Sequence, residues 1–491
     1  FIDHLSLKYI LFNNMLLTKN INKKLLKEQI FPTYNIEKKQ NCILHFGVGN
    51  FHRAHQALYI HEILENNKNI SIVGVNLRSN ETNLKLIKQD YLYTLVRISK
   101  DFKEIKILNP IKKILFGKKD KIEIRNLIAS KDIKLITITV TEKGYHFDKD
   151  KKLNYSKDII NDLENKNLNT VIGHISFGLI QRFKLNKEKI IIMSCDNLSE
   201  NSNILKNLIY EFLTKIYPQC LKWFLSNVEF PLSMVDGIVP NNNKNSKFFN
   251  IPYEDNSIVV TEPYRDWYIQ SDNVVLKKIL NNKNIIFVNN INFYENIKLK
   301  ILNGAHSSLA YIGILLGHTH VHEAMADKIC FNFISQFLDL EVLPTFENKD
   351  NFDIKNYKNN VLSRFKNPYI EDKLIRIAMD GSLKIPIRLL DTYKKNKNKT
   401  PYIDAIITSW ILFLQHMIVK NKSNLSDSNK EFIINTYEND KENFVLNLLN
   451  QKNLFNLNEY QKINLEKNII NNINQIKKIT FTNFLSNLVF K

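Results

Sequence analysis

The segment ENIKLKILNGAHSS, residues 295–308, brings together four polar side chains that could carry acid–base chemistry. They fall within an arc of about 140° if the segment is one α-helix with about 100° per residue. The four are Glu295, Lys298, Asn303 and His306. A solvated polar face, or a helix that ends before the Asn303–Gly304 dipeptide, is the alternative interpretation.

These residue types suit the interconversion of an alcohol and a ketone. A lysine that is desolvated beside a cationic ring has a pKa below its free value of about 10.4, so Lys298 could accept an alcohol proton. Asn303 could donate to the developing alkoxide, and His306 could orient or polarise the same oxygen. Asn197 ends the apolar run KIIIMSCDN and could complete the oxyanion site from the end of a strand. This chemistry requires no metal.

A second candidate is HFGVGNFHRAHQ, residues 45–56, in a chain with only 12 glycines. We expect a buried strand, a turn at Gly47 and Gly49, and a helix that begins within residues 52–56. Glycines at such a junction let the backbone approach a pyrophosphate. Arg53 could bind the phosphate through two N–H groups. The pattern predicts a dinucleotide loop, although a tight turn without a ligand would look similar.

Histidines cluster in two places without predicting a metal site. His52 occupies the third glycine position of the usual dinucleotide fingerprint, and the loop that holds His45, His52 and His55 offers no acid or cysteine as a further ligand. In HTHVHE, a helix would send alternate side chains to different faces, so at most His318 and His322 could meet. We therefore expect no metal.

The next apolar run, ISIVGVNL, should end at the residue that reads the ribose of a dinucleotide. An acid there selects the 2′-hydroxyl, and an arginine tolerates a 2′-phosphate. The residues at that place are Arg78, Ser79, Asn80 and Glu81. We expect Arg78 to contact the cofactor. NAD is the expected cofactor, with NADP open, because no acid stands at the usual place.

The elements that must position these residues change in kind along the chain. Short β-branched runs alternate with helical stretches in the first half, which predicts a mainly parallel α/β sheet. From about Phe293, apolar residues recur at helical spacing. We predict an α/β amino-terminal Rossmann-like domain over residues 1–290, of which 1–30 form an extension, and a mostly α-helical carboxy-terminal substrate domain over residues 291–491.

The composition of the chain limits the kinds of binding partner that we expect. The net charge of +20 comes mostly from lysines scattered among Asn and Ile, whereas nucleic-acid sites usually concentrate cations on one stripe. The four cysteines form no CxxC pair, which fits a reducing cytoplasm. We found no run of roughly 18 uninterrupted apolar residues, the length of a membrane span. We expect a cytoplasmic protein with a small-molecule substrate, no nucleic-acid or membrane partner, and a monomeric state.

Taken together, these segments resemble the polyol-specific long-chain dehydrogenases, the family of mannitol 2-dehydrogenase and fructuronate reductase. The matching stretches follow the family's order from about residue 31 to about residue 390. They are HFGVGNFHRAHQALY, QDYLYTLV, TVTEKGY, MSCDN, FPLSMVDGIVP, VTEPYRDW, KLKILNGAH and RFKNPYIEDKLIRIAMDGSLKIP. One departure is Gly237, where the family commonly has arginine after MVD.

The resemblance implies a role for each candidate residue. Lys298 would be the general base, and Asn197 with Asn303 would form the oxyanion site. His306 would hold the substrate, and Glu295 would gate proton exit from the buried lysine. Arg376 and Lys384 match positions that contact substrate hydroxyls or a carboxylate. The cofactor pyrophosphate would be bound by Gly47, Gly49 and Arg53.

The leading hypothesis is an NAD(P)-dependent, metal-independent polyol dehydrogenase that interconverts D-mannitol and D-fructose. A rival with the same chemistry is a fructuronate reductase acting on D-mannonate and D-fructuronate, or an enzyme for another polyol such as arabinitol. A rival of another class is a basic binding protein without turnover, which contacts RNA through its lysines.

Overall fold

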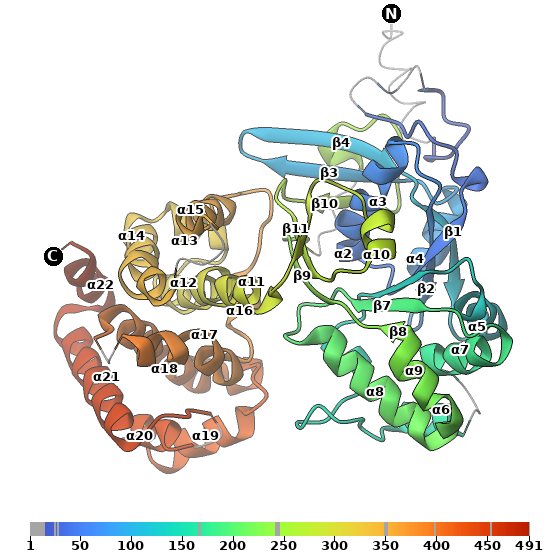
Figure 1. Cartoon of the computed structure of the whole chain (residues 1–491). Coiled ribbons are helices and arrows are strands. Elements are labelled where there is room, and N and C mark those ends of the chain that lie inside the picture. Colours follow the sequence, from blue (N-terminus) through green and yellow to red (C-terminus); the bar gives the residue numbers. More distant parts are fainter. Residues whose placement is uncertain are drawn as a thin grey trace, which may run out of the picture. The chain divides into compact units, whose positions relative to one another are not determined.

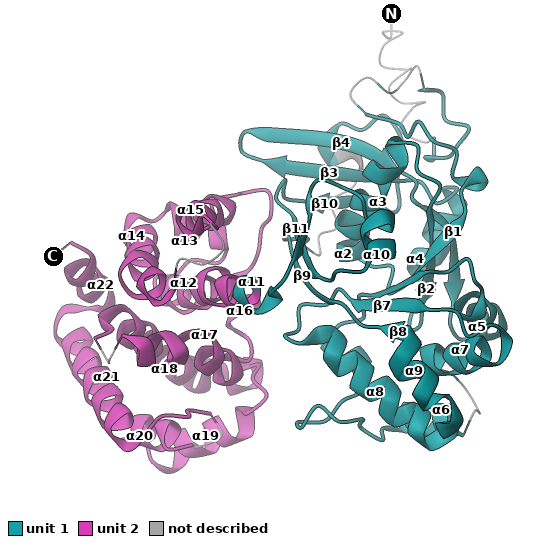
Figure 2. Cartoon of the chain, in the orientation of Figure 1, with its two compact units in different colours: residues 1–294 teal, residues 295–491 magenta. Residues whose placement is uncertain are grey.

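The computed structural model describes residues 15–23, 26, 29–164, 168–240, 246–347, 352–396, 399–451 and 454–490. Two compact units meet in the sequence between Tyr294 and Glu295, close to the predicted boundary after residue 290 (Figure 2). Much of the predicted extension, residues 1–30, lies outside the described residues. Its described part is tied to unit 1, because the N–H of Leu17 donates to the carbonyl of Glu254 at 2.9 Å.

The main sheet of unit 1 has six parallel strands in the order β5-β2-β1-β6-β7-β8 (Figure 1). Their bounds are β1 (Asn41–Phe46), β2 (Ser71–Asn76), β5 (Ile111–Phe116), β6 (Leu135–Ile138), β7 (Ile190–Ser194) and β8 (Val228–Glu229). Numbered along the chain within this sheet, the order is 3-2-1-4-5-6, which is that of dinucleotide-binding folds. The predicted parallel α/β sheet is confirmed, and its topological switch point lies between β1 and β6.

Helices cover both faces of this sheet, because successive side chains of a strand point to opposite faces. Ile43 of β1 packs in one apolar cluster with Leu58, and the next residue, Leu44, packs in another with Leu179. The helices of unit 1 are α2 (Asn50–Ala54), α3 (Gln56–Glu65), α4 (Glu81–Lys88), α5 (Lys121–Ala129), α6 (Lys157–Leu163), α7 (Val171–Leu185), α8 (Asn201–Ile216), α9 (Leu221–Asn227) and α10 (Val274–Ile279). Both faces of β1 are therefore buried, which explains its continuous apolar sequence.

Two three-stranded sheets complete unit 1. One has the order β10-β3-β4 and the other β12-β11-β9. Their bounds are β3 (Tyr93–Ser99), β4 (Phe102–Leu108), β9 (Leu232–Asp236), β10 (Val259–Thr261), β11 (Asp266–Gln270) and β12 (Ile285–Val288). The strand expected in SIVVTEP is β10, which pairs with β3 and not with the main sheet.

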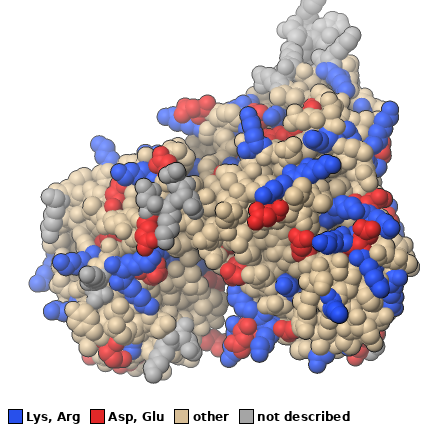
Figure 3. Space-filling model, in the orientation of Figure 1, with Lys and Arg blue, Asp and Glu red and all other residues tan. Residues whose placement is uncertain are grey.

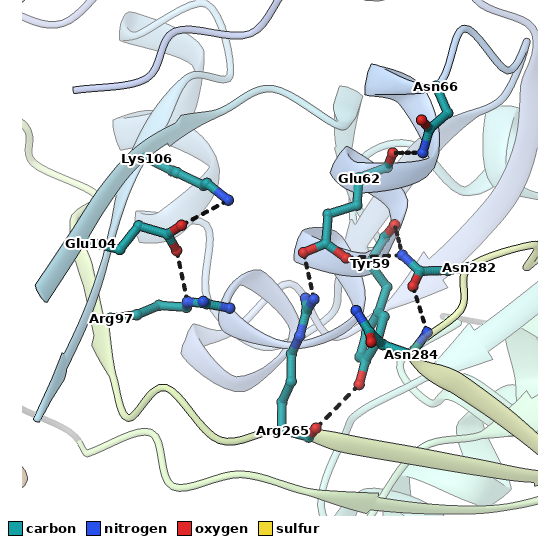
Figure 4. A network of polar contacts seen from close by, with 9 residues as sticks. All are labelled: Tyr59, Glu62, Asn66, Arg97, Glu104, Lys106, Arg265, Asn282 and Asn284. Atoms are coloured by element: carbon teal, nitrogen blue, oxygen red, sulfur yellow. Dashed lines mark hydrogen bonds and ion pairs between the residues drawn. The ribbon is translucent and has the colours of Figure 1, made fainter. Parts of the chain in front are cut away.

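A polar network fastens helix α3 to the chain that enters β11 (Figure 4). Arg265 pairs with Glu62 at 2.5 Å and lies over the ring of Tyr59, 4.0 Å from its centroid. Asn282 donates to Glu62 at 2.9 Å. In the same view Glu104 of β4 pairs with the guanidinium of Arg97 at 2.8 Å. The contacts of Glu62 with Arg265 and Asn282 hold α3, the second helix after the glycine turn.

Unit 2 is helical in its described residues, as predicted. Its elements, together with α11 across the boundary, are α11 (Ile291–Ile297), the π-helical segment η6 (Lys298–Asn303), α12 (Gly304–Leu315), α13 (Val321–Ala326), α14 (Lys328–Phe337), α15 (Ile354–Phe365), α16 (Leu374–Ala378), α17 (Gly381–Lys395), α18 (Pro401–Asn421), α19 (Lys430–Asn439), α20 (Phe444–Leu449), α21 (Glu459–Ile479) and α22 (Phe481–Val489). Helix α12 contacts α14, α16, α17 and α18. It is buried on nearly all sides, as its apolar sequence requires.

One stretch of the described residues, Pro401–Asn424, is long and apolar enough to cross a membrane. Within the structure, 72% of its apolar window is buried. Its α-helical part, α18, contacts α12 and α21. Packing inside unit 2 therefore accounts for its apolar character.

Charge is spread over the surface. On the face drawn in Figure 3, Lys and Arg side chains are scattered over both units, with Asp and Glu between them. Many exposed lysines pair with acids, such as Lys113 with Glu123 at 2.6 Å and Lys422 with Glu438 at 2.9 Å. On that face the net charge of +20 does not gather into a single stripe.

Candidate active site

The turn after β1 depends on Gly47. Its φ is +99°, and a Cβ at this position would lie 2.1 Å from the carbonyl oxygen of Thr139. The N–H of Gly47 donates to the carbonyl of Val75 at 2.8 Å, and its own carbonyl accepts from the hydroxyl of Thr139 at 2.8 Å. Asn76 fixes the next residue, because its side-chain oxygen accepts from the N–H of Val48 at 2.7 Å. Close backbone approach between β1, β2 and β6 therefore requires glycine here.

A cavity of about 270 Å³ opens at this turn. It is lined by residues that follow β1, β2 and β6, together with the start of α7: Gly47, Val48, Gly49, Asn76, Leu77, Arg78, Ser79, Thr82, Thr139, Val140, Gly144, His146, Asn169, Thr170 and Val171. The carboxyl ends of the strands on either side of a switch point are where open α/β sheets bind ligands. A Cβ on Gly49 would meet no atom closer than 4.0 Å, so the backbone is bare on the cavity side. This cradle fits a dinucleotide.

Arg53 does not line this cavity, contrary to the prediction that it neutralises the pyrophosphate. The helix begins at Asn50, earlier than the expected 52–56, because Gly49 takes the extended N-cap conformation. Arg53 is 5% exposed and donates to the carbonyl of Ser257 and, at 2.7 Å, to Asn50. Its guanidinium also lies over the ring of Tyr93. The side chain thus joins α2 to β3 and the segment before β10.

The histidines of the glycine loop pack inside unit 1. His45 on β1 lies with Nε2 3.1 Å from the carbonyl oxygen of Gly47 and Nδ1 2.8 Å from the hydroxyl of Thr137. His52 stacks on His45 with ring centroids 3.5 Å apart, and His55 donates to the carbonyl of Asp266 at 2.8 Å. Burial lowers the pKa of His45 to about 3, so the ring is neutral. His52 therefore supplies the helix–strand packing that the third glycine supplies in the usual fingerprint.

Asp196 joins two of the motifs. It follows β7 and accepts from the N–H groups of Val140 and Thr141 at 3.0 Å and from the hydroxyl of Tyr145 at 2.8 Å. These three donors belong to the loop after β6. Asn197, the predicted oxyanion residue, is the next residue and is exposed. The partly buried Asp196 fixes the backbone from which Asn197 projects.

The predicted catalytic lysine lies on an irregular part of a long helix. α11 passes into the π-helical segment η6, which runs from Lys298 to Asn303, and α12 follows from Gly304 without a break. The expected regular helix is therefore wrong over these six residues. A π-helix closes hydrogen bonds between residues five apart, which is the spacing of Lys298 and Asn303. The segment moves these two residues toward one face, whereas an α-helix would hold them about 140° apart.

The side chains on this helix differ in burial. Lys298 is 8% exposed, and Asn303, His306 and Glu295 are partly buried. The ring of His306 stacks on Phe365 of α15, with centroids 4.0 Å apart and planes 9° from parallel. This stacking fixes the plane of the imidazole. A nearly buried amine on the same helix as an amide and an imidazole suits proton transfer at an alcohol.

Known proteins match both units. The family model for the mannitol dehydrogenase Rossmann domain matches residues 41–282, and that for the mannitol dehydrogenase C-terminal domain matches residues 290–477. The chain belongs to the mannitol dehydrogenase family. A mannitol 2-dehydrogenase of Aspergillus fumigatus is 32% identical over 373 residues, 72% of this chain and 74% of that protein. A polyol:NADP oxidoreductase of Gluconobacter oxydans is 28% identical over 394 residues, 77% of this chain and 81% of that protein.

A solved structure extends this likeness to the fold. The mannitol 2-dehydrogenase of Pseudomonas fluorescens, in a ternary complex with NAD and D-mannitol, is 27% identical, with a TM-score of 0.81. It covers 97% of this chain, which covers 100% of that one. A D-sorbitol dehydrogenase in substrate-free form, at 24% identity and a TM-score of 0.83, shows the same fold.

In this mannitol dehydrogenase fold, a residue that sequence reasoning missed supports the π-helical segment. Arg388 of α17 donates to the carbonyl of Asn303 at 3.1 Å and to the hydroxyl of Ser307 at 2.7 Å. Lys300, also in the segment, pairs with Asp391 of α17 at 2.5 Å. Burial lowers the pKa of Arg388 to about 10, so the side chain stays charged at neutral pH. Arg388 lies two residues after the GSLKIP stretch, so no motif signalled it.

The two predicted substrate cations differ in their partners. Arg376 of α16 is exposed and forms a two-point pair with Asp372, at 2.8 and 2.6 Å. Lys384 of α17 is partly buried and donates to the carbonyl of Ile377 at 3.3 Å. Burial, and then the nearby Arg388, lowers the pKa of Lys384 to about 8. Arg376 is neutralised by its partner, whereas no acid pairs with Lys384 among the described residues.

The structure also describes the backbone at Gly237 and the surroundings of His318. Gly237, where the family commonly has arginine, has a φ of +156° that L side chains rarely adopt. Among the described residues, His318, Asp327 and Cys330 are the group that could hold a metal ion, with ligand atoms within 4.8 Å of one another. His318 pairs with Asp327 at 3.1 Å, and Asp327 caps α14 through the N–H of Ile329 at 2.7 Å. These contacts give Asp327 a role in the fold.

Proposed function

We propose that this protein is a polyol dehydrogenase that interconverts a sugar alcohol and its ketose with a nicotinamide dinucleotide, and that the pair is D-mannitol and D-fructose. Family membership and the dinucleotide cradle support the reaction class. The observation that carries the proposal is the placement of Lys298, nearly buried, with Asn303 five residues on in a π-helical segment. This is the arrangement that a proton acceptor and an alkoxide donor require.

The cradle residues would hold the cofactor. Gly47 and Gly49 present bare backbone to the cavity. When bound, the nicotinamide supplies the acceptor for the hydride that leaves the carbinol carbon. Relatives carry names that mention NAD or NADP, so names alone leave the cofactor's phosphate open.

The residues of the chain supply the proton chemistry. In the oxidation direction, the amine form of Lys298 accepts the hydroxyl proton at Nζ, and the amide of Asn303 donates to the oxygen as it gains negative charge. His306, held by Phe365, orients the same oxygen. Glu295 is assigned the passage of the proton from Lys298 to water. In ketose reduction, Lys298 returns the proton to the carbonyl oxygen.

Substrate choice depends on the charge available in unit 2. A hexonate substrate needs a cation without a carboxylate partner, and Lys384 meets that condition among the described residues. Reduction of fructuronate is therefore the second candidate function. We favour the neutral sugar because Arg376 is neutralised by Asp372 and the relatives that match this chain include mannitol 2-dehydrogenases.

The test is oxidation of reduced cofactor, followed at 340 nm, with fructose, fructuronate and tagaturonate offered separately. Fructose should give the highest kcat/KM. A preference for fructuronate would instead support the second candidate and assign Lys384 to its carboxylate. Absence of turnover with all three sugars, in protein that binds the cofactor, would contradict the proposed substrates.

A further inference from the structure

Three side chains of the kinds that bind metal ions come together where α12, α13 and α14 contact one another. His318 lies in the turn after α12, Asp327 stands between α13 and α14, and Cys330 belongs to the first turn of α14. One ligand atom of each residue lies within 4.8 Å of the other two. All three residues belong to unit 2, whereas the cavity at the glycine turn is lined by residues of unit 1.

The backbone of the turn after α12 holds His318 in place. Gly317 has a φ of +90°, and a Cβ there would meet no atom within 4 Å, so the conformation and not the space requires glycine. The N–H of Gly317 donates to the carbonyl of Ile314 at 3.0 Å. The N–H of His318 donates to the carbonyl of Gly313 at 2.8 Å, which completes the Schellman motif that ends α12. Helix α13 begins only at Val321, so the helical spacing considered for HTHVHE does not apply to His318.

The two carboxylate oxygens of Asp327 have different partners. Oδ1 accepts from the N–H groups of Ile329 and Cys330, at 2.7 and 3.3 Å, and so caps α14. Oδ2 lies 3.1 Å from Nε2 of His318. An oxygen and a nitrogen bound to one tetrahedral Zn²⁺, at about 2.0 Å each, stand roughly 3.3 Å apart. A zinc ion can therefore replace the proton between Oδ2 and Nε2 with little movement, while Oδ1 keeps its capping role.

Cys330 brings a buried sulfur donor to the same place. Its side chain is 0% exposed. Its thiol is free of a disulfide, and Sγ forms no hydrogen bond with any residue that the structure describes. A thiolate is a soft ligand that suits zinc, whereas magnesium and calcium prefer oxygen ligands. The combination of nitrogen, oxygen and sulfur donors therefore fits zinc.

The polar side chains that follow His318 already have partners. Glu323 accepts from the N–H groups of Thr319 and His320, both at 2.9 Å. Its other oxygen lies 2.9 Å from Nδ1 of His320. These contacts form the cap of α13, so the group offers three protein ligands. His318 and Asp327 are partly exposed, so water can take the fourth position around the ion.

We propose that His318, Asp327 and Cys330 form a zinc site that joins the turn after α12 to the start of α14. The sequence-based expectation of no metal in this stretch rested on histidine spacing alone, and the other two ligands come from outside the stretch. The site is separate from the proton chemistry proposed for Lys298, which needs no metal. Helix α12 continues directly from η6, so the ion stabilises the far end of the helix that carries Lys298 and Asn303.

The test uses full-length protein that is freed of metal with a chelator and then titrated with Co²⁺, a spectroscopic substitute for Zn²⁺. We expect one Co²⁺ per chain, with visible bands of tetrahedral geometry and a near-ultraviolet thiolate-to-cobalt band. One equivalent of Zn²⁺ should displace it. Cys330→Ser should remove the thiolate band. His318→Gln should weaken Zn²⁺ binding at least about tenfold, because even residues that only support a ligand contribute that factor.

The matched control is His320→Gln, which removes a histidine from the same stretch that pairs with Glu323 and lies outside the group. It should leave the affinity for Zn²⁺ unchanged. Zn²⁺ should also raise the midpoint of thermal unfolding of the wild type and of His320→Gln, but not that of His318→Gln. Circular dichroism verifies that each variant is folded. Because His318 is partly exposed, its replacement tests the site even if the buried Cys330→Ser does not fold.

Failure of the chelator-treated wild type to bind Co²⁺ or Zn²⁺ would overturn the inference. So would a thiolate band that survives Cys330→Ser, or an affinity for Zn²⁺ that His318→Gln leaves unchanged or lowers no more than His320→Gln does. Zinc binding without turnover of any sugar would support the site while contradicting the proposed function. Turnover of a sugar by a protein that binds no zinc would do the reverse.

Discussion

Two arginines near the glycine turn show that partners, more than position in a motif, decide what a side chain does. Arg53 lies inside the motif but is buried against Ser257 and Tyr93. Arg78 lies outside the motif and faces the cavity. The sequence identified both as cofactor candidates but could not separate them, because Ser257 is 204 residues from Arg53 along the chain. Contacts at that separation leave no local pattern.

At the residue scale, Lys384 gives a pH-dependent prediction. Its pKa of about 8 means that the side chain loses its positive charge as the pH rises through 8. If Lys384 contacts the substrate, KM for the polyol should rise above about pH 8, while Lys384→Arg should hold KM low to higher pH. Steady-state oxidation of mannitol between pH 7 and 9.5 measures this. A wild-type KM that stays constant over this range would show that Lys384 does not bind substrate.

The lowered pKa of Lys384 also determines how this residue makes the free energy of unfolding depend on pH. The pKa of Lys384 in the folded protein lies below the unfolded value of about 10.4. Between pH 8 and 10.4 the unfolded chain therefore binds more protons than the folded protein. The contribution of Lys384 to the free energy of unfolding accordingly increases with pH across this window.

At the scale of elements, the helix that carries Lys298 departs from the regular geometry that sequence periodicity assumes. The four polar residues were correctly placed on one continuous helix, but 100° per residue does not hold in η6. The extra residue of a π turn depends on tertiary contacts, here Arg388 to Asn303 and Lys300 to Asp391. Hydrophobic periodicity contains no information on such contacts.

This support predicts a positioning role for Arg388. Arg388→Met removes the donors to the backbone carbonyl of Asn303 and to the hydroxyl of Ser307, so the turn that carries Asn303 should lose its shape. We expect kcat to fall about 10- to 100-fold, with little change in cofactor affinity, because small displacements in an active site are costly. Arg388→Lys should recover part of the loss.

The matched control is Lys394→Met, which removes an exposed cation from the same helix and should leave kcat unchanged. Steady-state kinetics measures kcat, and titration with the cofactor measures its affinity. An Arg388→Met protein that is folded and has wild-type kcat would show that η6 holds its shape without this contact.

A second element-scale prediction concerns the start of α18. The two carboxyl oxygens of buried Glu341 accept from the N–H groups of Tyr402 and Ile403, at 2.7 and 2.9 Å, and burial raises the pKa of this carboxyl group to about 8. Glu341→Gln keeps only one acceptor, so the free energy of unfolding should fall by about 1–2 kcal/mol. Urea denaturation measures the change. Asp339→Asn, which breaks a surface pair with Lys358, is the control and should stay within about 0.5 kcal/mol.

At the scale of the whole molecule, the sequence predicted the main architecture because its apolar residues form recognisable patterns in each unit. The β-branched runs became β1, β2, β6 and β7, and the 3.6-residue pattern became the helices of unit 2. The two small sheets were not predicted. Their strands pair across long separations, as β10 does with β3, and short strands resemble loops in sequence.

The scattered charge also makes a prediction for the whole protein. Because lysines are spread among acids, binding to single-stranded RNA should be weak and should disappear between 50 and 200 mM salt. Dinucleotide binding, which is local to one cavity, should persist. Fluorescence anisotropy with a labelled oligonucleotide measures the binding of RNA. RNA affinity at 200 mM salt above that for the dinucleotide would favour a binding protein over an enzyme.

The most direct test of the account compares wild-type protein with Lys298→Ala in fructose-dependent oxidation of NADPH and NADH at 340 nm. We expect turnover by the wild type and a decrease in kcat of about 10²- to 10⁴-fold in the variant, with cofactor affinity preserved, since removal of a general base costs this factor. A variant as fast as the wild type would contradict the assignment of Lys298 as the base. A wild-type protein without turnover would contradict the assignment as a polyol dehydrogenase.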